Sequence, residues 1–98
     1  MAKTVHNGTY VATGTTNLIN GSGAILGLLV SHAEATIQTI TLYDALAASP
    51  GDEIAVLNIA PESQPFYLML ARTKVLTFST GLTIVTTNCH TNVWAVAY

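Results

Sequence analysis

The sequence predicts an all-β protein, a single antiparallel β-sandwich domain of jelly-roll-like form, and three observations support this fold class. First, threonine alone contributes 15 of the 98 residues, and valine and isoleucine are also frequent. These residues favour the pleated, half-buried surface of a strand. Second, turn-forming residues interrupt the chain at short intervals. Third, the side chains between the turns alternate with the period of two that is typical of strands.

Nine segments have the length and composition of strands, and turn signals separate most of them. Asn7-Gly8 predicts a tight hairpin turn, because both residues tolerate positive φ. Asn20 to Gly23 and Ser49 to Asp52 are further turns, and the prolines Pro61 and Pro65 predict a loop. We therefore expect strands near residues 9–13, 15–19, 24–32, 35–43, 53–59, 66–71, 74–79, 82–87 and 91–97.

One stretch competes for a helix. Residues 43–49 are rich in alanine, and Asp44 is a suitable N-cap. The stretch is too short for more than one or two helical turns, so the all-β prediction stands.

Both faces of the expected strands are rather apolar. In the last strand, Trp94, Val96 and Tyr98 share one face, and Val93, Ala95 and Ala97 share the other. Each face must therefore contact something, either a second sheet or a neighbouring chain. The pattern does not distinguish the face that meets the core from the face that meets a partner.

The domain organisation is simple. No linker, repeat or low-complexity segment divides the chain, and its length suits one domain. We expect residues 1–98 to form a single β-sandwich domain. As a further hypothesis, residues 1–20 form an N-terminal arm that contacts neighbouring subunits.

Few residues are charged, and this limits the partners of the protein. Eight residues carry a formal charge, giving a net charge of −2, whereas about one-quarter of an ordinary domain is charged. Much of the surface is therefore expected to lie against other subunits. Lys3, Arg72 and Lys74 are too few to neutralise a run of phosphates or to bind a membrane surface. The longest apolar run, Ala24 to Val30, is too short to span a bilayer.

No pattern predicts catalysis, a cofactor or a metal. Gly21 to Gly27 is one residue too long for a dinucleotide-binding loop, and no strand–loop–helix unit surrounds it. Cys89 and His90 are adjacent and would point to opposite faces of a strand, and His6 and His32 are distant in sequence. The lone cysteine is expected to be buried, and an unpaired thiol suits a reducing compartment. We expect no enzymatic activity, no cofactor and no metal.

Four segments together resemble a known family. They are Ala35 to Asp44, which ends in Tyr-Asp; Gly51 to Ala55; Phe78 to Thr87; and the terminal strand Val93 to Tyr98. Their order resembles the small β-sandwich decoration, or cement, proteins of tailed bacteriophages, which bind the outside of the phage head and commonly form trimers. The resemblance covers about two-thirds of the chain, from Gly23 onward. Residues 1–20 have no counterpart in it, and Cys89-His90 departs from the small residues expected there.

The resemblance implies a structural virion protein that is made in the host cytoplasm and resides on the capsid surface. There it would bind the outer surface of a bacteriophage capsid and stabilise it, as a homotrimer that bridges major capsid subunits. The large side chains in short strands or at the terminus are the predicted contacts: Tyr10, Phe66, Tyr67, Trp94 and Tyr98. Two alternatives stay open. One is another virion subunit, of the tail or of head completion, and the other is a small carbohydrate-binding β-sandwich.

Overall fold

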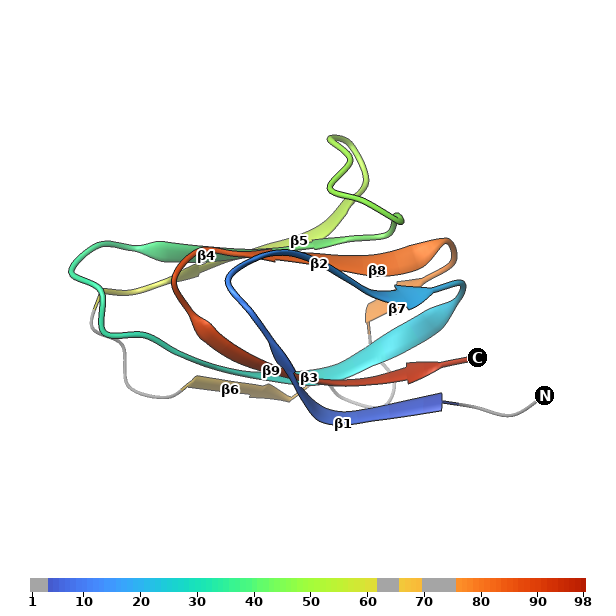
Figure 1. Ribbon diagram of the computed structural model, residues 1–98, viewed down its shortest axis with the longest axis horizontal. Helices are drawn as coiled ribbons and strands as arrows, with labels where there is room; N and C mark the ends of the chain where they lie inside the picture. The colour runs from blue at the N-terminus through green and yellow to red at the C-terminus, as the bar shows by residue number, and fades with distance from the viewer. Residues whose placement is uncertain (1–3, 62–65, 70–75) are drawn as a thin grey trace.

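In the computed structural model, nine strands form two antiparallel sheets that lie face to face (Figure 1). The structure describes the backbone of residues 4–61, 66–69 and 76–98, and the side chains of residues 7–61 and 76–98. The described residues contain no helix. The strands are β1 (Thr4–Val11), β2 (Gly14–Asn20), β3 (Gly23–Ser31), β4 (Gln38–Tyr43), β5 (Glu53–Ile59), β6 (Phe66–Met69), β7 (Leu76–Phe78), β8 (Gly81–Thr86) and β9 (His90–Ala97).

The strand order is that of a jelly roll. The five-stranded sheet has the order β1-β9-β3-β6, with β7 also paired to β3, and the four-stranded sheet has the order β2-β8-β4-β5. The pairs are therefore nested: β1 pairs with β9, β2 with β8, β3 with β6 and β7, and β4 with β5. Successive pairs alternate between the two sheets, as in a double-sheet jelly roll. The predicted fold class is confirmed.

Each of the nine predicted segments overlaps a strand, although β1 begins at Thr4 rather than near residue 9, and one turn prediction was wrong. Asn7-Gly8 does not form a hairpin, because β1 continues through it and pairs with β9 on both sides. Gly8 has φ +67 and lies where the register shifts between His6 and Thr9, so its positive φ serves a β-bulge. The chain crosses from β1 to the other sheet at Ala12 and Thr13 instead. The predicted strand ends at 71 and 74 fall outside the described residues.

The first 20 residues contribute one strand to each sheet within their described part. β1 pairs with β9, and β2 pairs with β8. Residues 4–11 and 14–20 thus pair within the two sheets, and the hypothesis that residues 1–20 form an arm stays a prediction. Contact of this segment with neighbouring subunits stays a prediction.

The alanine-rich stretch after β4 forms bends rather than a helix. Asp44 does not cap a helix there; its carboxylate instead accepts hydrogen bonds from the backbone of the β7–β8 turn, from Thr80 N at 2.8 Å and Ser79 N at 3.0 Å. These long-range hydrogen bonds hold the chain in a bent loop, although the local sequence is also compatible with a helical turn.

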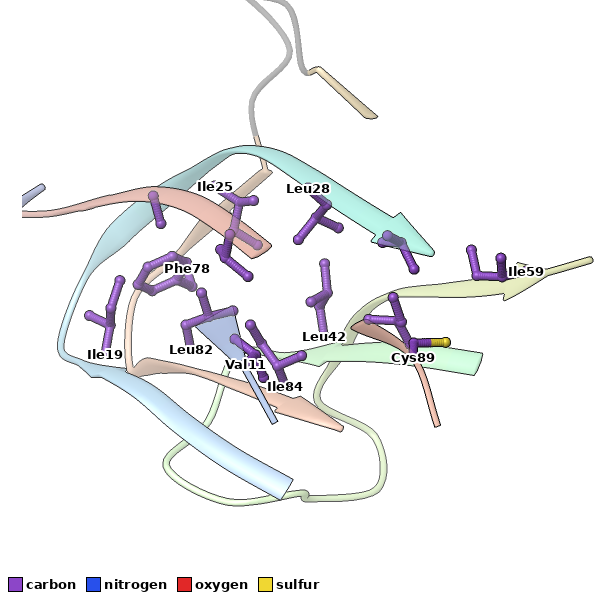
Figure 2. Packing of buried hydrophobic residues seen from close by; sticks show 14 residues of the cluster. Val11, Ile19, Ile25, Leu28, Leu42, Ile59, Phe78, Leu82, Ile84 and Cys89 are labelled. Carbon is purple, nitrogen blue, oxygen red and sulfur yellow. The ribbon is translucent and has the colours of Figure 1, made fainter. Parts of the chain in front are cut away.

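The core lies between the sheets and consists of the inward-facing side chains. Figure 2 shows Leu28 of β3 and Leu42 of β4 pointing toward each other across it, and both are almost fully buried. Burying one such side chain is worth about 1.5–3 kcal/mol. In β9 the inward residues are Val93 and Ala95, each 0% exposed, so Trp94 points to the outer face of the five-stranded sheet. The structure thus distinguishes the two faces that the sequence pattern left open.

Candidate interaction surfaces

The outer faces of both sheets carry one charge among the described side chains, that of Glu53, which pairs with Tyr43 at the start of β5. The described acidic residues lie in loops or at a strand end: Glu34 follows β3, Asp44 and Asp52 lie between β4 and β5, and Glu53 begins β5. No lysine or arginine falls among the described side chains. A strand face with so little charge can pack against another protein without burying many charged side chains.

An aromatic cluster occupies the outer face of the five-stranded sheet along β1 and β9. We define it as Tyr10, His90, Asn92 and Trp94. Tyr10 is the register partner of Asn92 and is 54% exposed. Its ring lies 4.7 Å from the ring of His90, between centroids, at an interplanar angle of 32°. The Asn92 side-chain amide donates a hydrogen bond to the backbone oxygen of Gly8 at 3.0 Å, which ties the cluster to the bulge of β1.

Trp94 lies over a glycine in the adjacent strand. A Cβ placed on Gly8 would come within 3.1 Å of Trp94 Cζ2, so the indole packs directly on the Gly8 backbone. On its other side, the register partner of Trp94 is Gly27 of β3. Glycine at both neighbouring positions leaves room for the large ring to lie close to the sheet.

The outer face of the four-stranded sheet is rich in threonine. Thr15, Val85, Thr41 and Val56 are successive register partners across β2, β8, β4 and β5. Threonine and valine on a flat face present methyl groups at regular intervals, while the hydroxyl groups can still accept or donate hydrogen bonds. Val56, on the strand at the edge, is 54% exposed.

Asp44 connects two loops at one end of the sandwich. Its carboxylate accepts hydrogen bonds from the backbone N–H groups of Thr80, Ser79 and Gly81 and from the Ser79 hydroxyl. These bonds, first from Thr80 and then from Ser79, lower the pKa of Asp44 below its ordinary value. Asp44 therefore fixes the β7–β8 turn against the β4–β5 loop, a structural role that the Tyr-Asp ending of the strand did not reveal by itself.

The five predicted contact residues have different locations. Tyr10 and Trp94 share the outer face of the five-stranded sheet, and Trp94 is partly buried. Tyr98 follows β9, is 54% exposed, and donates its backbone N–H to Ser22 O at 3.0 Å. Phe66 and Tyr67 lie in β6, where side chains are outside the described part. The contact role of all five stays a prediction.

Sequence reasoning missed other exposed hydrophobic side chains: Leu26, Ile37, Leu46 and Val56.

The cysteine and the histidine beside it face opposite ways, as predicted. Cys89 is buried and His90 is exposed, and burial raises the pKa of the Cys89 thiol. His32 is also buried; its Nδ1 accepts a hydrogen bond from Glu34 N, so Nε2 carries the proton and donates to Ile59 O at 3.4 Å.

Within the described residues no three histidine, cysteine or acidic side chains cluster as a metal site. No helix there is long and apolar enough to cross a membrane.

Comparison with known proteins finds similarity only in structure. No protein-family model matches the chain, and no curated protein does. Among solved structures, a chain of the virus-like particle of extra small virus from the prawn Macrobrachium rosenbergii is 11% identical, with a TM-score of 0.38, covering 97% of this chain and 74% of that one. The VP2 subviral particle of infectious bursal disease virus is 16% identical, with a TM-score of 0.30, covering 97% and 29%.

A chain of the T13 particle of infectious bursal disease virus is 14% identical, with a TM-score of 0.31, covering 96% of this chain and 30% of that one. The protein thus spans less than a third of the two bursal-disease virus chains. These similar structures come from virus particles. Likeness of this degree carries no argument about function, which has to come from the surfaces of the chain itself.

Proposed function

We propose that the protein is a structural component of a virion, which binds the outer surface of a bacteriophage capsid and stabilises it as a homotrimer bridging major capsid subunits. The observation that carries the proposal is the scarcity of charge on both outer sheet faces, where Glu53 at the start of β5 is the one charged residue among the described side chains. A protein with such faces is better suited to packing between subunits than to free diffusion. The jelly-roll topology agrees with this use, since capsid domains share it, although fold alone does not determine function.

The available surface is large enough for such contacts. A standard protein interface buries about 800 Å² per partner, which is roughly one-seventh of the 5481 Å² accessible surface of the chain. We assign the capsid contact to the aromatic cluster, because large aromatic side chains commonly anchor interfaces. Binding to the folded form alone would also stabilise the protein by mass action.

The test combines light scattering of the purified protein with co-sedimentation on phage capsids that lack it. We expect a trimer, alone or as a pair of trimers, that sediments with the capsids. Tyr10→Ser, which removes an exposed ring of the cluster, should abolish co-sedimentation and leave the thermal unfolding midpoint nearly unchanged. The matched control is Leu46→Ser, at a loop position that is 56% exposed, and it should bind like the wild type. Two results would overturn the assignment. One is a wild type that is monomeric and does not sediment with the capsids, and the other is equal co-sedimentation of Tyr10→Ser and Leu46→Ser.

A carbohydrate-binding β-sandwich is the second candidate, and the composition of the aromatic cluster favours it. Sugar rings stack on exposed aromatic side chains, and Asn92 offers an amide oxygen beside Tyr10 and Trp94. Saturable quenching of Trp94 fluorescence by a glycan, together with failure to bind capsids, would select this function over the first.

A further inference from the structure

Of the described edge strands, β5 has the longest stretch of unbroken register, five residues against four in β6, which also pairs without a shift. β1 is interrupted by a bulge between His6 and Thr9, and β2 by one between Asn17 and Ile19. The β4–β5 pairing also shifts register between Leu42 and Tyr43, but from Ala55 to Ile59 it is unbroken, and among the described strands β5 pairs with no other. Its seven residues include neither lysine nor proline. Proteins commonly protect sheet edges by bulges, lysine or proline, and an unprotected edge is a template for pairing with another strand.

The hydrogen bonds of β4 show which β5 groups face outward. Thr39 O accepts a hydrogen bond from Thr87 N at 3.1 Å, and Thr39 N donates to Thr87 Oγ1 at 2.9 Å. The backbone of Thr39 therefore faces away from β5. Because successive residues of a strand direct their backbone groups to alternate sides, Ile40 and Leu42 face β5.

The register then assigns the outward groups of β5 itself. Leu57 is the partner of Ile40, and Val56 and Asn58 are the partners of Thr41 and Thr39. Leu57 thus exchanges hydrogen bonds with β4, whereas Val56 and Asn58 direct their N–H and C=O groups to the open edge. The bond from Asp44 N to Asp52 O at 2.9 Å fits the same alternation at the far end of β4.

The side chains confirm that this edge is open. Val56 is 54% exposed and Asn58 is also exposed. Leu57 has its side chain on the core side of the sheet, yet it is only partly buried, whereas its partner Ile40 is 0% exposed. The apolar side chain of Leu57, at the margin of the core, is therefore partly exposed to solvent along the β5 edge.

We propose that β5 pairs antiparallel with β5 of a second copy of this chain, around a two-fold axis at Leu57. Val56 of one copy then lies opposite Asn58 of the other, and each of the two such pairs exchanges two N–H···O=C bonds, because both residues direct these groups outward. The contact is self-complementary, as a two-fold interface requires. It joins two four-stranded sheets into one continuous sheet.

The same register suits the side chains. The two Leu57 residues lie directly opposite each other as a non-hydrogen-bonded pair, with Cβ atoms about 4.5–5.5 Å apart, and cover the uncovered margin of each core. Because the two strands run antiparallel, the two Glu53 residues lie at opposite ends of the paired segment and do not meet. The two-fold contact goes beyond the proposed function and holds with or without capsid binding.

The first test removes one outward hydrogen-bond donor. Val56→Pro deletes an N–H that β4 does not use, and edge strands accept proline at such positions. Light scattering should give the wild type a mass that is an even multiple of the chain mass, and Val56→Pro half of that mass at the same concentration. The matched control Val56→Thr keeps the N–H and should keep the full mass. Halving is the expected result for a dimer and for a pair of trimers, so it is independent of the proposed homotrimer.

The second test needs no variant and covers the case in which Val56→Pro does not fold. Amide hydrogen exchange of the wild type should show Leu57 N–H protected at every concentration, whereas Val56 and Asn58 N–H become protected only as the assembly forms. Fast exchange of Val56 and Asn58 in the assembled protein would overturn the proposal. So would a wild type that stays monomeric or forms a trimer alone, or one that protects these amides only when a foreign peptide strand is added.

Discussion

Replacing Gly8 by alanine tests the position of the Trp94 ring on the outer face of the five-stranded sheet. Gly8 has φ +67, a conformation that costs other residues roughly 1–2 kcal/mol. The new Cβ would also lie 3.1 Å from Trp94 Cζ2, so the indole must shift. Together we expect a loss of about 1–3 kcal/mol in the free energy of unfolding. At about 4–8 °C per kcal/mol for a domain of this size, the unfolding midpoint should fall by roughly 4–24 °C.

The assay uses thermal unfolding by circular dichroism together with tryptophan emission, because the chain contains one tryptophan. An indole displaced from Gly8 meets more water, so its emission should move to longer wavelength. Gly51→Ala is the matched control: Gly51 has φ +95, and nothing lies within 4 Å of a Cβ placed there. It should lose stability through its backbone alone and leave the emission unchanged. If Gly8→Ala loses no more stability than this control and its emission does not move, the indole does not pack on Gly8.

Three further predictions concern the core, the acid at the loops and the thiol. Leu42→Ala should lower the free energy of unfolding by about 2–5 kcal/mol, whereas Leu46→Ala, at a side chain 56% exposed, should change it by less than about 0.5 kcal/mol; equal effects in urea titrations would contradict the assigned core. Because hydrogen bonds lower the pKa of Asp44, its contribution to stability is present above its unfolded value of 3.8 and is lost as the pH falls through the lowered pKa. Asp44→Asn should therefore unfold at lower temperature than the wild type at pH 7, and the gap should close in strong acid; a gap that persists there would refute the role of the charge. The Cys89 thiol should react slowly with a disulfide reagent in the native protein and fully after denaturation, and fast native reaction would show that it is not buried.

The strands could be predicted from the sequence because their signal is local. Alternation and β-branched composition located all nine, and the jelly-roll-like class followed from their number and spacing. The error at Asn7-Gly8 has a physical cause. A hairpin turn and a β-bulge both use glycine at positive φ, and the choice between them depends on pairing with β9 at the other end of the chain.

The candidate surfaces could be predicted only in part. The scarcity of charge in the sequence predicted outer faces with little charge, and the large aromatic side chains were proposed as contacts because of their size. The aromatic cluster itself depends on register: Tyr10 lies beside Asn92 and diagonal to Trp94 because β1 pairs with β9. Burial of Val93 rather than Trp94 also escaped prediction, because both faces of the strand are apolar. The hydrogen bonds of Asp44 join segments more than 30 residues apart, and no local pattern encodes them.

The nested pairing of the strands also bears on how the chain reaches its native state. β4 and β5 are neighbours in sequence, whereas β1 must wait for β9, which emerges from a ribosome on the order of 10 s later. Such non-local pairing slows folding to milliseconds or longer, so the sandwich is expected to close from its innermost hairpin outward. Hydrogen-exchange labelling during refolding reads this order directly. The strand that keeps an open edge in the finished sandwich would then be among the first to form, and two nascent chains could meet along β5 before either has closed its core.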